Sequence, residues 1–230
     1  MTKVIFWLGG IDVHRQFAVI GLGRFGTSVA RTLFHLGHDV LAIDVNEDRL
    51  QYVKHEVTST AIADTTDVEV LKSLGIRNFD VVVVAIGEDI QSNVMTTLLL
   101  KEQGVPFVVA KALNKMHGRV LEKIGADRVV YPERDMGKRV AHNLVSANLV
   151  DYFEIASGYR VEEVIAPRWM QGQTLGHLDL RHKYGVTAIL LRRPDGSLDF
   201  NPGAETIVSI SDVLVLAGSV HDLERLDEKE

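Results

Sequence analysis

A glycine-rich segment near the start of the chain constrains the fold more than any other feature. Residues 17–26 read FAVIGLGRFG, in which an apolar, strand-like run leads into Gly21, Gly23 and Gly26 with the spacing G-x-G-x-x-G. In a strand–turn–helix unit the first glycine allows a tight turn, the second lets a diphosphate approach the backbone, and the third lets the helix pack against the strand. The pattern therefore predicts a nucleotide site at the start of the first helix, where exposed N–H groups favour an anion.

The next strand-like run supports this prediction, which a glycine pattern alone would leave weak. The run VLAID ends at Asp44, about 20 residues beyond the glycines, where nucleotide-binding units place the carboxylate that accepts hydrogen bonds from the ribose hydroxyls. An acid at this position argues against a ligand with a 2′-phosphate. The alternative interpretation is a glycine turn kept for packing, with Asp44 only capping the helix that follows.

Residues 16–150 alternate apolar β-branched runs with helical segments, which predicts a parallel sheet covered by helices on both faces. The runs expected to form strands are 17–20, 40–44, 60–64, 80–87, 106–111 and 128–131. Right-handed crossovers then give a Rossmann-like, doubly wound sheet of order 3-2-1-4-5-6. We expect the ligand crevice at the carboxyl ends of these strands, lined by Gly21 to Gly26, Asp44, Asp64, Ile86, Gly87 and Lys111.

The pattern changes after a last helix that is expected from Glu133 to about Leu149. Short strand-like segments then alternate with turns such as Pro194–Ser197, which predicts a small α+β lobe without a glycine fingerprint. The predicted organisation is an N-terminal arm at 1–15, a nucleotide-binding lobe at 16–150, a linker at 151–158, a C-terminal lobe at 159–222 and a tail at 223–230.

Composition excludes several classes of function. The 230 residues include no cysteine, which removes disulfides, thiolate metal sites and a cysteine nucleophile. The formal net charge is −6 and the pI is near 5.8, so nucleic acid is not expected as a partner. No apolar run reaches the roughly 18 to 20 residues that a membrane helix needs, and we expect a soluble protein.

Sequence motifs for catalysis are missing as well. Short-chain dehydrogenases carry Tyr-x-x-x-Lys, yet none of the five tyrosines has a lysine four residues on. The patterns G-x-S-x-G and H-E-x-x-H do not occur either. We therefore expect a binding module whose output is conformational, and not an enzyme. The alternatives are a small NAD-dependent oxidoreductase with 159–222 as its substrate lobe, and a redox or energy sensor.

Five segments in order along the chain closely resemble the cytosolic RCK (or KTN) gating subunits of bacterial Ktr and Trk potassium-uptake systems, and the Ktr subunit most. They are AVIGLGRFG, VLAIDVNED, LGIRNFDVVVVAIG, VLEKIGADRVVYPERDMG and LRHKYGVTAILL, and the resemblance covers about residues 16–222. It implies a cytoplasmic protein, peripheral on the membrane, that binds ATP or ADP. It further implies homodimers that assemble into an octameric ring and gate a membrane potassium-channel subunit.

The resemblance also implies roles for single residues. In Ktr subunits the arginine that matches Arg24 reaches the terminal phosphate of ATP. The glutamate that matches Glu133 holds a divalent cation, Mg²⁺ or Ca²⁺, between two ATP molecules across a dimer interface. Lys111 is a second candidate phosphate contact. The full set expected to bind the cofactor is Gly21, Gly23, Arg24, Phe25, Gly26, Asp44, Asn46, Asp64, Ile86, Gly87 and Lys111.

The identity of the base is more open than that of the phosphates. Asn46 and Asp64 are expected near the ribose and the adenine, but Asp64-Thr65-Thr66 is similar to the Trk form Gly-Asp-Ala-Thr as much as to the Ktr form. Trk subunits are linked to NAD(H), which therefore stays an alternative ligand. Arg24 favours ATP and ADP, since a guanidinium suits a terminal phosphate.

The second lobe resembles the RCK C-terminal module, which in some Ktr subunits binds cyclic di-AMP between the two lobes of a dimer. Arg181, in LRHKYG, matches the arginine of that site, and Ile189 and Pro202 are apolar neighbours that could flank a base. The alternative is a lobe that serves only as a dimerisation surface.

Overall fold

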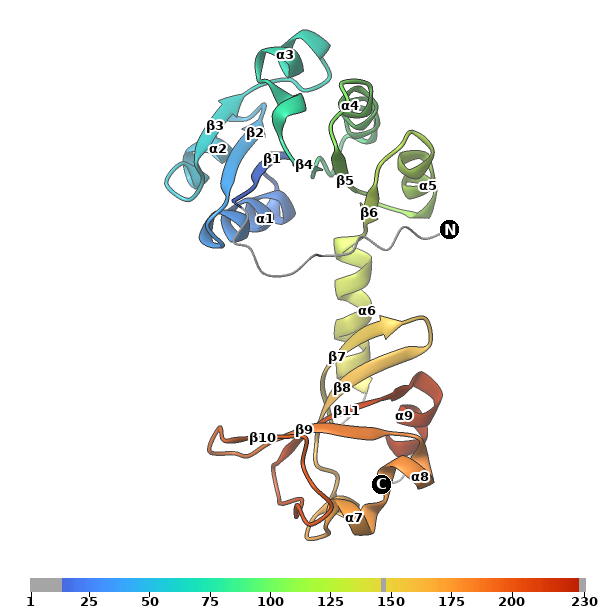
Figure 1. The fold of residues 1–230 in the computed structure, drawn as a ribbon. Coiled ribbons are helices and arrows are strands. Elements are labelled where there is room, and N and C mark those ends of the chain that lie inside the picture. The colour runs from blue at the N-terminus through green and yellow to red at the C-terminus, as the bar shows by residue number, and fades with distance from the viewer. Residues whose placement is uncertain (1–13, 146–147, 228–230) are drawn as a thin grey trace. The chain divides into compact units, whose positions relative to one another are not determined.

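The chain divides between Glu133 and Arg134 into two compact units, each with its own sheet (Figure 1). The computed structural model describes residues 14–145 and 148–227. Of the N-terminal arm expected at 1–15, residues 1–13 lie outside the described residues.

The first unit is built on a six-stranded sheet of order β3-β2-β1-β4-β5-β6, which confirms the predicted order. All of its neighbouring strands run parallel. From β1 the chain adds β2 and β3 on one side of the sheet and then crosses to the other side of β1 to form β4. The loops after β1 and β4 therefore leave the sheet in opposite directions, and a crevice opens between them. The strands are β1 (Gln16–Ile20), β2 (Asp39–Asp44), β3 (Ser59–Ile62), β4 (Val81–Val84), β5 (Phe107–Lys111) and β6 (Arg128–Val130).

Helices follow the strands as the alternating pattern predicts. Four of them begin at an Asn or Asp whose side chain accepts a hydrogen bond from a first-turn N–H group. The first helix differs, because it begins after Gly23 and has no side-chain cap. The helices of this unit are α1 (Arg24–His35), α2 (Glu47–Val53), α3 (Val68–Ser73), α4 (Ile90–Glu102) and α5 (Lys115–Lys123), with a 3-10 turn η1 (Ile76–Asn78).

The sheet separates two apolar cores. Phe17 and Val19 of β1 belong to a core that includes residues of α1 and α2. Ala18 and Ile20 of the same strand belong to the other core, which includes residues of α3, α4 and α5. Successive side chains of a strand point to opposite faces, so both faces of the sheet are covered by helices. This arrangement explains the continuously apolar strands of the sequence.

The second unit is an α+β lobe, as predicted, on an antiparallel sheet of order β10-β9-β11-β8-β7. A single core of buried residues lies under its short helices, with Leu214 and Leu216 of the sheet both fully buried. The elements are α6 (Pro132–Val145), β7 (Leu149–Ala156), β8 (Tyr159–Ile165), η2 (Arg168–Met170), α7 (Leu175–Leu178), α8 (Leu180–Tyr184), β9 (Thr187–Arg192), β10 (Leu198–Phe200), β11 (Val213–Ser219) and α9 (Val220–Asp227).

Several boundaries in this half differ from the expected ones. The segment 151–158 is not a linker, because most of it belongs to β7, which pairs with β8 through a turn that contains Gly158 at a φ of 79°. Residues 223–227 are not a tail, since Leu223 and Leu226 of α9 are buried in the lobe's core. The helix expected from Glu133 to Leu149 ends at Val145, and the units divide at its beginning, not near residue 150.

Among the described helices, none is both long enough and apolar enough to cross a membrane.

Candidate functional site

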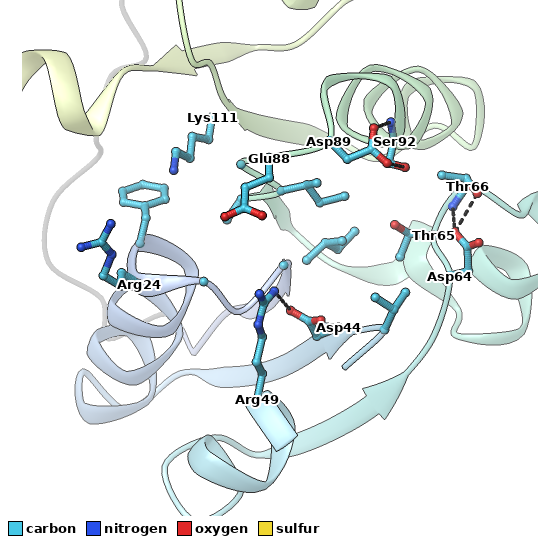
Figure 2. Close-up of a pocket in the computed structure, with 18 of the residues that line it drawn as sticks. Arg24, Asp44, Arg49, Asp64, Thr65, Thr66, Glu88, Asp89, Ser92 and Lys111 are labelled. Carbon is cyan, nitrogen blue, oxygen red and sulfur yellow. Dashed lines mark hydrogen bonds and ion pairs between the residues drawn. The ribbon is translucent and has the colours of Figure 1, made fainter. Parts of the chain in front are cut away.

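A cleft of about 420 Å³ lies in the first unit, where the predicted crevice residues meet (Figure 2). Of the residues expected to bind a cofactor or metal in the first unit, all line this cleft except Gly26 and Asn46. Gly26 packs inside the glycine turn, and Asn46 caps α2 by accepting a hydrogen bond from the Arg49 N–H group at 3.3 Å. The predicted residues that line it are Gly21, Gly23, Arg24, Phe25, Asp44, Asp64, Ile86, Gly87, Lys111 and Glu133.

The three glycines of the turn are required for different reasons. Gly21 has a φ of +91°, and a Cβ atom there would lie 2.9 Å from the Ile86 nitrogen. A Cβ at Gly26 would lie 1.9 Å from the Gly21 carbonyl oxygen. A Cβ at Gly23 would meet nothing within 4 Å, and Gly23 lines the cleft. Packing within the protein therefore explains Gly21 and Gly26, whereas at Gly23, the N-cap of α1, a side chain would project into free space beside the cleft.

Asp44 is held at the carboxyl end of β2 by the backbone around it. Its Oδ2 accepts a hydrogen bond from the Leu22 N–H group at 2.6 Å, and its Oδ1 accepts one from Asn46 at 2.9 Å. Arg49 places Nη1 3.5 Å from Oδ2. Only 3% of the Asp44 side chain is exposed, yet it lines the cleft. A carboxylate accepts about four hydrogen bonds, so the group is oriented by the glycine turn and retains capacity for ligand hydroxyls.

Positive charge gathers beside the glycine turn. The Lys111 Nζ atom lies 2.7 Å from Glu133 Oε1, and the same Nζ would be 3.1 Å from a Cβ at Gly87. The hydrogen bond from Lys111 lowers the pKa of the Glu133 carboxyl below its ordinary value of 4.5, and the charge of Arg24 acts in the same direction. Glu133 is therefore ionised at neutral pH and faces two cations, at a place where a phosphate would compete for both.

The other end of the cleft is polar and acidic. Figure 2 shows Asp64, Thr65 and Thr66 there, with Asp44 between them and the Arg24–Lys111 end. Asp64 accepts hydrogen bonds from the Thr66 hydroxyl at 2.7 Å and the Thr66 N–H group at 2.9 Å. Both bonds lower the pKa of Asp64 below 3.8, and the bond from the Thr66 hydroxyl has the larger effect. Because Thr66 fixes the Asp64 carboxylate, this loop is prepared before a ligand arrives.

Some lining residues were not among the predicted site residues. Asp89 caps α4 and accepts hydrogen bonds from Ser92, whose hydroxyl lowers the pKa of Asp89. An Asp immediately before an apolar helix is a capping signal, but this signal does not show that the loop lies at the cleft. Arg49 lies in the first turn of α2, five residues after Asp44. Its positive charge close to a predicted ribose-binding carboxylate was the one sequence feature that could have indicated a place in the cleft. The missed polar residues are Arg49, Thr65, Thr66, Glu88, Asp89 and Ser92.

The charges that line the cleft are unbalanced toward the negative. Five carboxylates, Asp44, Asp64, Glu88, Asp89 and Glu133, face three cations, Arg24, Arg49 and Lys111. A polyphosphate would add further negative charge. Within the described residues, no cluster of three or more His, Asp or Glu side chains has the geometry to hold a metal ion. Glu133 could therefore serve as one ligand of a cation only if phosphate oxygens or another subunit supplied the rest.

The residues predicted for cyclic di-AMP lie in the second unit. Ile189 of β9 is 42% exposed, and its carbonyl oxygen accepts a hydrogen bond from the Asn201 N–H group at 2.8 Å. Pro202 is the next residue after Asn201 in the chain. Arg181 lies on a different element, α8, with an exposed side chain. The assignment of these three residues stays a prediction.

Comparison with known proteins identifies the family. The TrkA-N domain family matches residues 17–132, and the TrkA-C domain family matches residues 160–229. Ktr system potassium uptake protein C of Bacillus subtilis (strain 168) is 45% identical over 217 residues, which are 94% of this chain and 98% of that protein. The chain belongs to the Ktr family of potassium-uptake proteins. The resemblance inferred from the five sequence segments is thus confirmed.

Other relatives extend the match. Ktr system potassium uptake protein A of Vibrio alginolyticus is 37% identical to this Ktr-family chain over 204 residues, which are 89% of the chain and 92% of that protein. Among solved structures, the GsuK channel superposes with a TM-score of 0.68 at 21% identity, covering 94% of this chain and 39% of that one. At this identity the likeness shows the fold, and it confirms a Rossmann-like lobe followed by a smaller one.

Proposed function

We propose that this Ktr-family chain is a cytoplasmic regulatory subunit, peripheral on the membrane, that binds ATP or ADP in the cleft of its first unit. As a ring of homodimers, octameric in the complete assembly, it gates a membrane potassium-channel subunit according to which nucleotide is bound. The relatives named as potassium-uptake proteins support the transport role. The cleft supports the choice of ligand.

The observation that carries the proposal is the order of groups along the cleft. Arg24 and Lys111 stand at one end, Asp44 in the middle, and Thr65 and Thr66 at the other end (Figure 2). An adenine nucleotide has the same order of chemistry, from anionic phosphates through ribose hydroxyls to a base with hydrogen-bonding edges. The uncapped start of α1 adds N–H groups and a positive dipole end to the phosphate side.

Arg24 is the proposed sensor of the terminal phosphate. It is the first residue of α1 and its side chain is exposed, so it can reach a phosphate outside the glycine turn. A guanidinium donates two parallel hydrogen bonds to a phosphate, and a third phosphate gives it a partner that ADP lacks. ATP and ADP would therefore order the start of α1 differently, and this difference is the proposed signal.

A divalent cation is the proposed partner of ATP. The cleft already carries more carboxylates than cations, so a triphosphate would add repulsion that Mg²⁺ or Ca²⁺ would offset. Glu133, together with phosphate oxygens from two subunits, forms the proposed ligand set at the dimer interface. Oxygen ligands of this kind suit hard cations. In the absence of ATP, Lys111 neutralises Glu133 instead.

The second unit is the proposed site for cyclic di-AMP, at Arg181, Ile189 and Pro202 of two neighbouring subunits. Exposed Ile189 offers an apolar surface to a base, and Arg181 offers a donor to a phosphate. If no dinucleotide binds, the same surface serves dimerisation.

Equilibrium binding to the full chain tests the function. We expect ATP and ADP to bind, with Mg²⁺ or Ca²⁺ raising the affinity for ATP far more than that for ADP. Asp44→Asn should weaken both nucleotides about 10-fold or more, since hydrogen bonds to a charged group contribute about 1.5 to 3 kcal/mol each. Isothermal titration calorimetry with ATP, ADP and NAD(H), with and without the cation, measures each affinity.

Two results would contradict the proposal. Tight binding of NAD(H) without measurable binding of ATP or ADP would make the chain a dinucleotide sensor. Oxidation of NADH by a panel of carbonyl substrates would make it an oxidoreductase. Unchanged ATP and ADP affinities in a folded Asp44→Asn variant would remove the ribose assignment alone.

A further inference from the structure

Helix α4 carries three buried polar side chains that the proposed function does not use. Asn93, Thr96 and Thr97 are each 0% exposed, although burial of a polar group is unfavourable unless it forms hydrogen bonds. None of the three lines the cleft. Asn93 and Thr96 bond to residues that do line it, whereas the Thr97 hydroxyl has no hydrogen-bond partner among the described residues.

Asn93 joins the ends of β4 and β5 at the point where they separate. The register of the two strands runs as far as Val84 and Ala110. Beyond that pair, the Asn93 Nδ2 group donates to the carbonyl oxygen of Ile86 at 2.7 Å and to that of Lys111 at 3.1 Å. Ile86 and Lys111 both line the cleft. One side-chain amide thus continues the strand pairing and sets the spacing of the walls at the phosphate end.

The other half of the Asn93 amide indicates why asparagine stands here. Its Oδ1 atom is buried and has no hydrogen-bond partner among the described residues. A leucine of similar size would remove this unpaired acceptor, but it would also leave the carbonyl oxygens of Ile86 and Lys111 without the Asn93 donor. The two N–H bonds to the strand ends are what the leucine would lose.

Thr96 supports the opposite end of the cleft. Its Oγ1 lies 2.9 Å from Oγ1 of Thr65, which is 4% exposed and lines the cleft beside Asp64. The hydrogen bond attaches the loop after β3 to α4. Because Asn93 and Thr96 sit one turn apart on a single helix, α4 holds both ends of the cleft at a fixed separation.

We infer that Asn93 and Thr96 are positioning residues of the nucleotide site, Asn93 for the phosphates and Thr96 for the adenosine. This inference rests on the proposed function and specifies how the site is supported. Neither residue touches the ligand. Each acts through a residue that does, Asn93 through Ile86 and Lys111 and Thr96 through Thr65.

A matched pair of substitutions on α4 provides the test. Thr96→Val and Thr97→Val remove the same hydroxyl from equally buried neighbours, but only Thr96 has a partner in the cleft. We expect Thr96→Val to weaken adenosine, ADP and ATP alike, by about three- to tenfold for one lost hydrogen bond. Thr97→Val should leave all three affinities within twofold of the parent. Calorimetric titrations of the full chain with the three ligands measure these changes.

Asn93→Leu tests the phosphate end of the cleft separately from the adenosine end. We expect it to weaken ADP and ATP by about three- to tenfold and to leave adenosine unchanged. In the absence of ligand, it should also speed amide hydrogen exchange in residues 85–89, the segment that Asn93 attaches to β5. If Asn93→Leu fails to fold, the Thr96 and Thr97 pair still decides between support and general packing.

The outcomes distinguish this inference from the proposed function. If the parent chain binds ADP and ATP but Thr96→Val behaves as Thr97→Val does, the inference alone is overturned. Equal losses of adenosine and ATP in Asn93→Leu would overturn the assignment of Asn93 to the phosphate end. If the parent binds none of the three ligands, the proposed function fails and this inference fails with it.

Discussion

At the scale of single residues, Arg24 and Lys111 bring positive charge to the same end of the cleft in different surroundings. Lys111 is buried and is already paired with Glu133, so a phosphate must compete for it. Arg24 is exposed at the first position of α1 and is available to a group that projects from the cleft. The two cations should therefore contribute differently to the recognition of ATP and ADP.

Arg24→Ala is expected to separate the two nucleotides. Loss of a charge-assisted bond to the terminal phosphate should weaken ATP by about 10- to 100-fold, while ADP should change by less than about threefold. Arg31→Ala is the matched control, because Arg31 lies on the same helix but pairs with Glu56 and stacks on Tyr52. Parallel titrations give the ratio of ATP to ADP affinity, and an equal loss of both nucleotides would leave Arg24 a general phosphate contact.

At the scale of elements, two glycines of the turn into α1 should respond differently to substitution by alanine. Gly26→Ala places a methyl group 1.9 Å from the Gly21 carbonyl oxygen and should destabilise the first unit by about 1 to 3 kcal/mol or more. Gly23→Ala places its methyl in open space. Its effect on stability should be near zero, because the gain of about 0.4 to 1 kcal/mol from a stiffer unfolded chain is offset by a poorer helix cap.

For nucleotide binding, in contrast to stability, Gly23 should be the sensitive position. Gly23→Ala is expected to fold normally and to lose most of its affinity for ATP and ADP, since its methyl occupies the space of the diphosphate. Denaturant unfolding and nucleotide titration of the same preparation check both halves of this prediction. A Gly23→Ala protein that keeps parental affinity would show that no phosphate approaches the turn.

The contact between α6 and β7 gives a pH-dependent prediction within the second unit. Arg139 hydrogen-bonds the Asp151 carboxylate, with Nε 2.6 Å from Oδ1, and this bond lowers the pKa of Asp151 below its ordinary 3.8. A lowered pKa means that the pair stabilises the fold above pH 3.8 and that this contribution is lost as the pH falls through the folded-state pKa.

Asp151→Asn should therefore lower the melting temperature at pH 7, and the difference from the parent should shrink as the pH falls through the folded-state pKa of Asp151, which lies below 3.8. The effect is small, because both side chains are more than a third exposed. Thermal unfolding at several pH values measures it. An Arg139→Gln, Asp151→Asn double variant should be no less stable than either single one, and additive losses would mean that the two residues act separately.

At the scale of the whole molecule, the proposed signal depends on two subunits meeting around ATP and a cation. Glu133 is the second residue of α6, the helix that enters the second unit. A cation bound there only with ATP would couple nucleotide, cation and assembly, and such coupling is reciprocal. Mg²⁺ or Ca²⁺ should then tighten the dimer when ATP is present and have little effect with ADP.

Glu133→Gln keeps the size of the side chain and removes the charge that a cation needs. It should abolish the cation-dependent gain in ATP affinity and in dimerisation. Cation-free binding of ATP should not weaken, because Lys111 loses the partner with which a phosphate competes. Analytical ultracentrifugation and titration of the full chain measure both. Glu69→Gln is a suitable control, because Glu69 pairs with Lys72 on α3, outside the cleft. If the cation effect survives in Glu133→Gln, the proposed metal site is wrong.

Local sequence signals were sufficient for the first unit's architecture. Alternation of apolar strands with helices specifies a parallel sheet, right-handed crossovers limit its order, and the glycine spacing marks the turn into α1. Asp44 and the crevice residues at the strand ends could be located for the same reason. Each of these signals depends on residues near one another in the chain, or on the period of a single element.

What the sequence by itself determined is therefore the order of the first sheet, the presence of a smaller α+β lobe, and the edge at which the cleft lies. Only the tertiary structure decided that Asn46 caps α2 outside the cleft, that Thr65 enters it, and that 151–158 forms a strand and turn instead of a linker. These outcomes depend on partners distant in the chain, such as the Thr65–Thr96 bond and the pairing of β7 with β8. A periodic pattern reports which face of an element is apolar, whereas the identity of its partner is settled when the whole chain packs.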